Sequence, residues 1–292
     1  MSVLRVTTPV LEIGYESDGP ANGPPVILLH GWPDDVRTYD GVAPALQSAG
    51  MRTFAPWLRG FGPTRFRHAH TVRSGEVAAI AQDVLDFADA LGLDQFCVVG
   101  HDWGARAAYL LAAVAPRRVD RIAVMSLGWV PGAPTTPALE QARGFWYQWF
   151  MATRRGAEFV RGHPQAFARY QWDTWSPPGW FTDQDFERTA VSFENPAWLD
   201  VTLHYYRVRW GEAAPDPNHA RLTAAADEAH SITVPTLLLH GAADRCVLPQ
   251  SSRGTERYFT ARYRRELLDG IGHFPTREAP ETVAGLLLQF LR

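Results

Sequence analysis

The segment Val98-Val99-Gly100-His101-Asp102-Trp103-Gly104 constrains the fold more than any other part of the chain. A β-branched run ends there in Gly-x-Asp-x-Gly, and the helical pattern of Ala105 to Ala115 follows directly. This order predicts a buried strand, a sharp turn and a helix, with small flanking residues that let the turn present one side chain above a sheet. That side chain is Asp102. The alternative is a structural carboxylate in an ordinary strand-to-helix turn.

A carboxylate at the tip of such a turn favours a particular chemistry. A serine in the same place would attack an acyl carbon, whereas Asp102 is suited to displacement at a saturated carbon. The product would be an alkyl ester of the protein, which water must then cleave. An ester of this kind needs an activated water, and therefore a histidine with an acid that orients it.

Length and composition fit one α/β domain with an insertion, because 292 residues can bury a large core. The net charge of −3 gives no electrostatic support to a nucleic-acid or membrane partner. All 28 basic residues are arginines, which excludes Schiff-base chemistry by a lysine. Two cysteines, Cys97 and Cys246, and no apolar run of signal-peptide or membrane-spanning length predict a cytoplasmic protein.

Alternating strand and helix patterns predict an α/β fold with a doubly wound, mostly parallel sheet. An antiparallel pair is expected at the start, in Leu4 to Val6 and Leu11 to Tyr15. Further strands are expected at Pro25 to Leu29, Arg52 to Ala55, Gln95 to Val99 and Arg121 to Leu127, and helices at Val42 to Ala49 and Val77 to Leu91.

The alternation stops at about Trp129. From there to about Trp210 the chain is helical in pattern and holds eight of its eleven tryptophans. After a polar linker, Glu212 to Ser231, it resumes with strands at Thr236 to Leu239 and Arg264 to Leu268 and a helix at Glu281 to Leu291. We therefore expect an α/β core of residues 1–128 and 231–292, a helical cap with its linker at 129–230, and a site at the carboxyl ends of the strands.

Two segments after the expected cap supply the acid and the histidine. Leu239-His240-Gly241-Ala242-Ala243-Asp244 places Asp244 just past one buried strand. Gly270-Ile271-Gly272-His273-Phe274 places His273 in a glycine-rich loop past the next strand. Each alone would be an ordinary turn or loop residue, but the order nucleophile, acid, histidine is that of the α/β-hydrolase triad. The pattern thus predicts a triad of Asp102, Asp244 and His273.

Cleavage of the ester develops negative charge on its oxygen, so hydrogen-bond donors must be fixed there beforehand. The segment His30-Gly31-Trp32-Pro33 follows a buried strand and suits this role. The backbone N–H groups of Trp32 and Trp103 are the two predicted donors. The alternative for the first segment is a tight turn that merely contains a proline.

With these residues placed, the chain resembles the α/β-hydrolase superfamily over essentially its full length. His30-Gly31-Trp32-Pro33 together with His101-Asp102-Trp103-Gly104 is similar to the branch of epoxide hydrolases and haloalkane dehalogenases. Arg59-Gly60-Phe61-Gly62-Pro63-Thr64 is similar to a loop of that branch. Trp57 departs from relatives that have aspartate two positions before this arginine, and we expect altered loop packing. The resemblance implies neither a metal nor an organic cofactor.

Epoxide hydrolases of this branch use two cap tyrosines to hold and protonate the epoxide oxygen. Phe145-Trp146-Tyr147-Gln148-Trp149-Phe150 is similar to the segment with the first tyrosine, and His204-Tyr205-Tyr206-Arg207 to that with the second. The resemblance thus implies Tyr147 and Tyr206, and disfavours Tyr205. A phenol with a pKa near ~10 can donate to a developing alkoxide and stay protonated at neutral pH. These rings could instead simply fill the cap core.

The expected substrate is a small, apolar molecule, with water as co-substrate; Trp103, Trp149 and Arg106 are expected to bind it. A dehalogenase is the alternative, in which the Trp103 indole would bind halide, although Trp32 stands where dehalogenases often have Asn or Glu. Fluoroacetate dehalogenases bind carboxylate with two arginines. Here Arg106 matches the second, while Trp103 replaces the first and Gln148 the halide-binding histidine. A non-catalytic ligand-binding role is more remote, and a homodimer is left open.

Overall fold

The central strands are continuous apolar runs because helices cover both faces of the sheet. The structure, a computed structural model, describes residues 3–132 and 136–292. Its strands are β1 (Leu4–Thr7), β2 (Leu11–Asp18), β3 (Pro25–Leu29), β4 (Arg52–Pro56), β5 (Arg65–Phe66), β6 (Phe96–His101), β7 (Val119–Met125), β8 (Thr236–Gly241) and β9 (Tyr263–Leu268). They form one sheet of order β1-β2-β4-β3-β6-β7-β8-β9, with β5 paired to β2.

The sheet is antiparallel at one edge and parallel elsewhere. β2 pairs antiparallel with β1, β4 and β5, whereas each neighbouring pair from β4 through β3, β6, β7 and β8 to β9 is parallel. The predicted α/β fold with a mostly parallel sheet is therefore confirmed. Parallel strands bring their carboxyl ends to one edge, and the segments after β3, β6 and β8 meet there.

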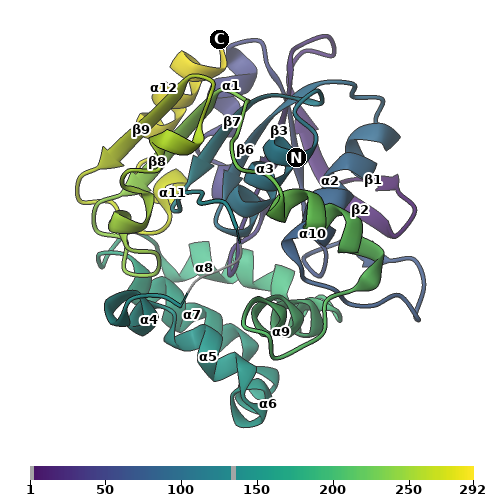
Figure 1. Ribbon diagram of the computed structural model, residues 1–292, viewed down its shortest axis with the longest axis vertical. Coiled ribbons are helices and arrows are strands. Elements are labelled where there is room, and N and C mark those ends of the chain that lie inside the picture. Colours follow the sequence, from purple (N-terminus) through teal and green to yellow (C-terminus); the bar gives the residue numbers. More distant parts are fainter. Residues whose placement is uncertain (1–2, 133–135) are drawn as a thin grey trace.

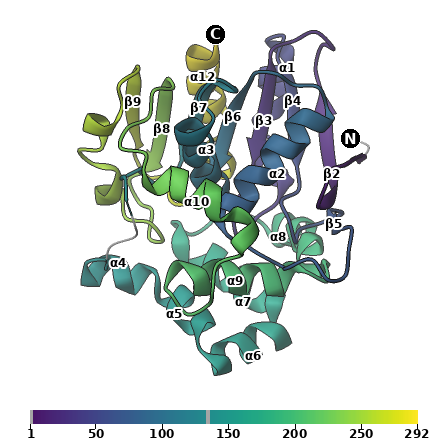
Figure 2. The same cartoon turned by 45° about the vertical axis from the view of Figure 1, so that its right-hand side comes forward.

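The core helices form a layer on each face of the sheet (Figures 1 and 2). On one face, α2 (Val77–Ala90) packs against α3 (Trp103–Val114). On the other, α1 (Ala43–Ser48) packs against α12 (Pro280–Leu291), which follows the short α11 (Pro275–Glu278). Within the described ranges, no helix combines the length and the apolar character needed to cross a bilayer.

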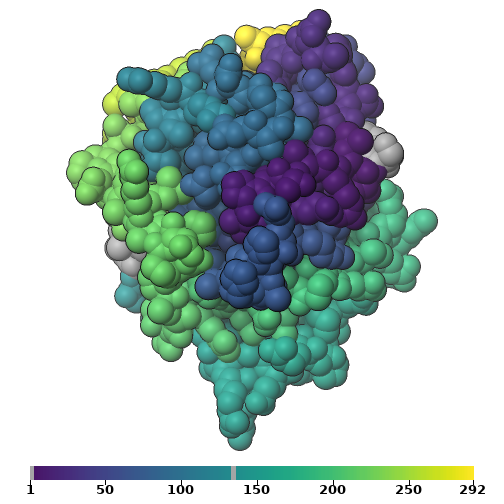
Figure 3. Space-filling model, turned by 90° about the vertical axis from the view of Figure 1, so that its right-hand side faces the viewer, coloured from purple at the N-terminus to yellow at the C-terminus, as the bar shows by residue number. Residues whose placement is uncertain are grey.

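Six of the α-helices between β7 and β8 gather beyond the carboxyl ends of the strands (Figure 2). They are α4 (Leu139–Gly144), α5 (Trp146–Ala152), α6 (Arg154–Gly162), α7 (Pro164–Trp175), α8 (Asp183–Ala190) and α9 (Trp198–Arg209). In the space-filling view their teal and green surface projects from one end of the molecule (Figure 3). We call this group the cap. The domain boundaries expected from the sequence stay a prediction.

The polar linker predicted from Glu212 to Ser231 contains helices that were not predicted from the sequence. A short 3₁₀ helix (Pro217–His219) and α10 (Ala220–Asp227) lie in it, and α10 packs on α3. The Asp216 side chain accepts the N–H of Asn218 and so caps the first of these helices. Alanines then give the following segment a high helix propensity, which outweighs its polar character.

The turn after β6 depends on close backbone approaches that only glycine permits. A Cβ on Gly104 would lie 2.1 Å from the carbonyl oxygen of Leu29 in β3. A Cβ on Gly100 would lie 2.4 Å from the carbonyl oxygen of Gly104, and one on Gly31 would lie 2.5 Å from Cβ of Asp102. The start of α3 can therefore lie directly against the end of β3, because none of these three residues has a side chain.

The substitution Gly104→Ala should destabilise the protein by about 1–3 kcal/mol, since its methyl group must displace backbone. Urea unfolding measures the free energy of unfolding. Gly285→Ala is the control, because no atom lies within 4 Å of its added Cβ in α12. It should stabilise by about 0.5–1 kcal/mol, as alanine does in a helix. Equal effects of the two substitutions would contradict this account of the turn.

Candidate functional site

Asp102 stands at the junction of β6 and α3 in a conformation that L-residues rarely adopt. Its φ is 48° and its ψ is −109°, so the turn is strained. Its Oδ1 accepts the backbone N–H of Trp32 at 2.9 Å. The N–H of Trp103 lies in the first turn of α3, where no intrahelical acceptor exists. The Trp32 N–H thus contacts the Asp102 carboxylate, which the positive end of α3 also favours, while the role of the Trp103 N–H stays a prediction.

The structure brings Asp244 and His273 to the same place. His273 Nδ1 donates to Asp244 Oδ2 at 2.9 Å, and His273 Nε2 lies 3.8 Å from Asp102 Oδ2. Asp244 Oδ1 accepts the N–H groups of Cys246 and Val247 at 2.8 and 2.9 Å. Burial alone would raise the pKa of Asp244, but His273 and His240 lower it to about 2. This carboxylate is therefore charged throughout the physiological range.

The imidazole of His273 is fully buried, and its Nε2 has no hydrogen-bond partner among the described residues. Burial would lower its pKa, but the Asp244 charge and hydrogen bond, with the charges of Asp102 and Glu278, raise it above the usual value. The arrangement leaves one ring nitrogen aimed at Asp102 with no partner. A water held between this nitrogen and Asp102 could be deprotonated there.

The hydrogen bonds that hold the His273 backbone could not be predicted from the sequence. Its carbonyl oxygen lies 2.6 Å from His101 Nε2 and accepts the Ser126 hydroxyl at 2.8 Å. Because a carbonyl can only accept, the proton of His101 lies on Nε2. The N–H of His273 donates to the Ser176 hydroxyl at 2.8 Å, which in turn donates to Glu278. Residues from four separate segments thus fix the loop.

Tyr147 on α5 and Tyr206 on α9 are buried beside the same tryptophan. The Trp32 ring stacks on Tyr147, with ring centroids 5.5 Å apart and 3° between the planes. It meets Tyr206 edge-on, also at 5.5 Å. The two tyrosine rings lie 5.4 Å apart. Since the Trp32 backbone N–H holds Asp102, the cap presents both tyrosines to the region of the nucleophile.

Each tyrosine oxygen accepts a hydrogen bond, and Tyr147 Oη also lies 3.6 Å from Cys246 Sγ, a contact in which either group can donate. The Trp103 indole donates to Tyr206 Oη at 3.2 Å, and Gln148 Nε2 donates to Tyr147 Oη at 2.8 Å. The orientation of this amide is fixed, because the Trp210 indole donates to Gln148 Oε1 at 3.0 Å and cannot accept. Burial and the Asp102 charge raise the pKa of both tyrosines well above 10. Both therefore stay protonated at neutral pH.

The other predicted residues lie around this centre. Tyr205 stacks on Trp103 with centroids 4.0 Å apart, and its buried hydroxyl has no partner in the described part of the chain. Trp149 packs on Trp210 and donates to the carbonyl of Ala142, so its contacts are within the cap. Its predicted role in substrate binding stays a prediction. Arg106 lies one turn after Asp102 on α3, beside a cavity described below.

Trp57 and Arg59, in the loop after β4, make buried polar contacts. The Trp57 indole donates to Asp35 Oδ2 and to the Ser192 hydroxyl of the cap, at 3.3 and 3.1 Å. Arg59 forms a buried two-point ion pair with Asp83, with distances of 2.6 and 2.7 Å. Across residues 3–132 and 136–292, no three His, Cys, Asp or Glu side chains group as metal ligands.

Comparison with known proteins agrees with this architecture. The model of the alpha/beta hydrolase fold family matches residues 24–280. Epoxide hydrolase A of Mycobacterium tuberculosis is 27% identical over 302 residues, spanning 94% of this chain and 92% of that protein. The crystal structure of a candidate epoxide hydrolase from Klebsiella pneumoniae superposes with a TM-score of 0.92 at 36% identity, covering 99% of this chain and 96% of that one. That of Epoxide Hydrolase A from Mycobacterium thermoresistibile gives 0.82 at 24% identity, covering 100% and 98%.

The fold and its relatives define a hydrolase of the α/β class. The chain belongs to the α/β-hydrolase fold family, and the predicted resemblance to its epoxide hydrolase branch is confirmed. The roles of Asp102, Asp244, His273 and the two tyrosines stay predictions, which the geometry now allows to be made specific.

Because the pKa of His273 is raised in the fold, its protonated form adds stability below about pH 6.5. This contribution is lost as the pH rises through the pKa of the folded state. Asp244→Asn keeps the burial but removes the charge, so the His273 pKa should fall. Histidine NMR titration of both proteins, with His273→Gln to assign the signal, measures the shift. An unchanged pKa would show that Asp244 does not set it.

Proposed function

We propose that the protein is an epoxide hydrolase that opens an epoxide to a vicinal diol through an ester on Asp102. The observation that supports this most is the pair Tyr147 and Tyr206. Both are buried at the Trp32 ring, each accepts a hydrogen bond at its oxygen, and burial raises the pKa of both phenols so that they stay protonated. Opening an epoxide requires a proton donor for the ring oxygen, and this is the chemistry that such a pair supplies.

In the first step, Asp102 Oδ2 attacks an epoxide carbon while Oδ1 stays bonded to the Trp32 N–H. The carbon–oxygen bond of the ring breaks, and the departing oxygen takes a proton from a tyrosine. The high pKa of both phenols keeps that proton in place until negative charge develops on the ring oxygen. The product is a hydroxyalkyl ester of Asp102.

In the second step, His273 Nε2 removes a proton from water, and the hydroxide attacks the carbonyl carbon of the ester. The N–H groups of Trp32 and Trp103 stabilise the oxyanion of the tetrahedral intermediate. Its collapse releases the diol and restores the Asp102 carboxylate. The proton that His273 took from water replaces the one that the tyrosine gave, so the cycle consumes only epoxide and water.

The dehalogenase alternative uses the same aspartate, histidine and acid but needs N–H donors for the leaving halide. The Trp103 indole, the expected donor, is engaged with the Tyr206 hydroxyl. This arrangement serves a tyrosine that donates to oxygen better than it serves a halide.

Intact-mass spectrometry of His273→Gln tests the covalent step. After incubation with styrene oxide the variant should carry an adduct one substrate mass heavier, because the ester forms but no base activates water. Asp102→Asn should carry none and should turn over no epoxide. An adduct from 1-bromobutane or fluoroacetate alone would assign the protein to the dehalogenases. Its added mass would be that of the substrate less one hydrogen halide. Epoxide turnover by the Asp102→Asn variant would overturn the mechanism.

Removal of either phenol tests the role of the tyrosines. Tyr147→Phe and Tyr206→Phe should each slow adduct formation with styrene oxide by about 10²–10⁴-fold, the usual contribution of a positioned acid. Tyr205→Phe is the matched control, because its buried hydroxyl is unpartnered, and it should leave the rate nearly unchanged. Stopped-flow quenching of tryptophan fluorescence follows ester formation. A similar loss in all three variants would indicate damage to cap packing instead.

A further inference from the structure

A cavity of about 320 Å³ lies between α3 and the cap. Arg106 from α3 and Arg209 from the end of α9 line it, with Leu127, Gln141, Phe145 and Val247 among the other residues. Most of this lining is apolar. Gln141 is already committed, because its amide bonds the Cys246 carbonyl and the Leu248 N–H. The two guanidinium groups and the Ser251 hydroxyl remain to bind a ligand, and only the guanidinium groups are charged.

Neither arginine forms an ion pair, or a hydrogen bond through its side chain, with any described residue. The Nε of Arg209 is buried with no partner, and its guanidinium carbon lies 5.7 Å from the Phe145 ring centroid. Burial, together with the positive charge of Arg106, lowers the pKa of Arg209 to about 10. Two partly buried cations thus face each other without a carboxylate, which is unfavourable unless an anion joins them.

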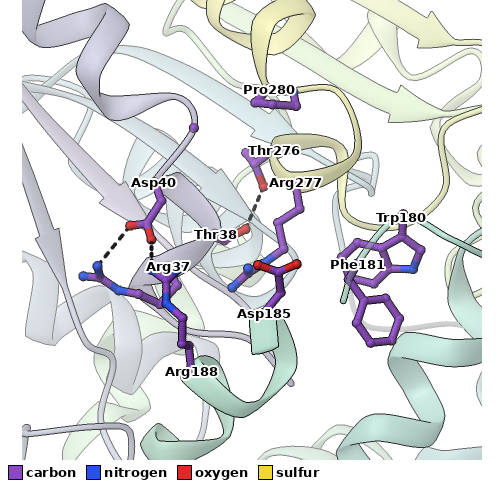
Figure 4. A pocket seen from close by; sticks show the side chains of 11 residues that line it. Arg37, Thr38, Asp40, Trp180, Phe181, Asp185, Arg188, Thr276, Arg277 and Pro280 are labelled. Atoms are coloured by element: carbon purple, nitrogen blue, oxygen red, sulfur yellow. Dashed lines mark hydrogen bonds and ion pairs between the residues drawn. The ribbon is translucent and has the colours of Figure 1, made fainter. Parts of the chain in front are cut away.

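In a second arginine-lined cavity, the arginines pair with carboxylates of the protein (Figure 4). This cavity, of about 170 Å³, lies where α8 and α11 meet. Arg37 and Arg188 both bind Asp40, at 3.1 and 2.8 Å, and Arg277 binds Asp34 at 2.6 Å. Each arginine that lines this cavity therefore has a carboxylate partner. The contrast singles out Arg106 and Arg209 as a pair whose counter-ion is not supplied by the described chain.

Glu76 and Asp227 lie near Arg209, in a neighbouring cavity on its other side. The Glu76 carboxylate accepts the Ser74 hydroxyl and the Asp216 N–H. Neither acid pairs with Arg209. On the Arg106 side, by contrast, the groups that act electrostatically on this guanidinium are, in order of effect, Tyr205, Asp102, Tyr147 and Tyr206. The cation pair is thus next to the site already described.

The separation along α3 limits the size of a ligand that reaches both places. The N–H of Arg106 donates to the Asp102 carbonyl at 3.0 Å, so the two residues are one helical turn apart, about 5.4 Å along the axis. Residues with this spacing are neighbours on a helix surface, so we expect a molecule that is bound to the Arg106 guanidinium and attacked by Asp102 to have a short carbon chain between its anionic group and its reacting carbon. Leu127, Phe145 and Val247 suit that short carbon chain.

We propose that Arg106 and Arg209 bind the carboxylate of the substrate, and that the substrates are short epoxy carboxylic acids. This inference rests on the proposed epoxide hydrolase function and replaces the expectation of a wholly apolar substrate. A carboxylate accepts two parallel hydrogen bonds from a guanidinium, and its negative charge suits two neighbouring cations, of which Arg106 already lies within the influence of Asp102. One arginine comes from the core and one from the cap, so the ligand also joins these parts.

A binding experiment tests the site without any turnover. Isothermal titration should show that the wild-type protein binds hexanoate about 10- to 100-fold more tightly than hexanamide, as expected for hydrogen bonds between charged groups. Arg106→Met and Arg209→Met should each abolish this preference. Arg161→Met, which changes an exposed cap arginine, should retain it. Equal binding of the acid and the amide by the wild type would overturn the site, whatever the fold of the variants.

Turnover separates this inference from the proposed function. With 5,6-epoxyhexanoate and 5,6-epoxyhexanamide, the wild type should have a kcat/KM about 10- to 100-fold higher for the acid, mainly through KM. Arg209→Met and Arg209→Gln should reduce the ratio towards one. Turnover of the amide and of styrene oxide without preference for the acid would overturn the carboxylate site alone. Absence of turnover of all three epoxides would overturn the proposed function and, with it, the assignment of epoxy acids.

Discussion

The strained turn at Asp102 is the constraint on which the rest of the site depends. Its positive φ is maintained because the end of β3 and the start of α3 are in direct backbone contact at Gly31 and Gly104. The same contact brings the Trp32 N–H to Asp102 Oδ1. One carboxylate oxygen is therefore immobilised and the other faces His273. A larger residue at either glycine would alter the backbone and the direction of the nucleophile together.

Trp32 connects the turn at Asp102 to the cap. Its backbone holds the carboxylate, while its ring contacts Tyr147, Tyr206 and Trp175. Trp175 in turn packs edge-on against His273 at 4.9 Å. The proposed proton donors and the proposed base are thus positioned against one indole by aromatic packing, which prefers particular ring geometries. This explains in physical terms why so many tryptophans lie in the segment that covers the site.

Local patterns were sufficient to predict the parallel sheet and to select the residues of the site, because strand ends and turns have short-range signatures. They could not show contacts between distant segments, such as Gln148 with Trp210 or Ser126 with the His273 carbonyl. The helix α10 was missed because its polar residues resemble a linker. The position of Arg209 near the site could have been predicted from the sequence. It follows Tyr206 by three positions on one helix, and residues with this spacing lie on the same face.

The electrostatics of the proposed cycle follow from the position of His273 between two acids. Asp244 and Asp102 both raise its pKa in the free protein. Esterification removes the charge of Asp102, so one of the groups that favour the imidazolium is lost when the intermediate forms. The His273 pKa should then fall, and more of the histidine becomes the neutral base that attack by water requires. Formation of the ester thus prepares its own hydrolysis, while Asp244, at a pKa of about 2, keeps its charge to stabilise the imidazolium that follows.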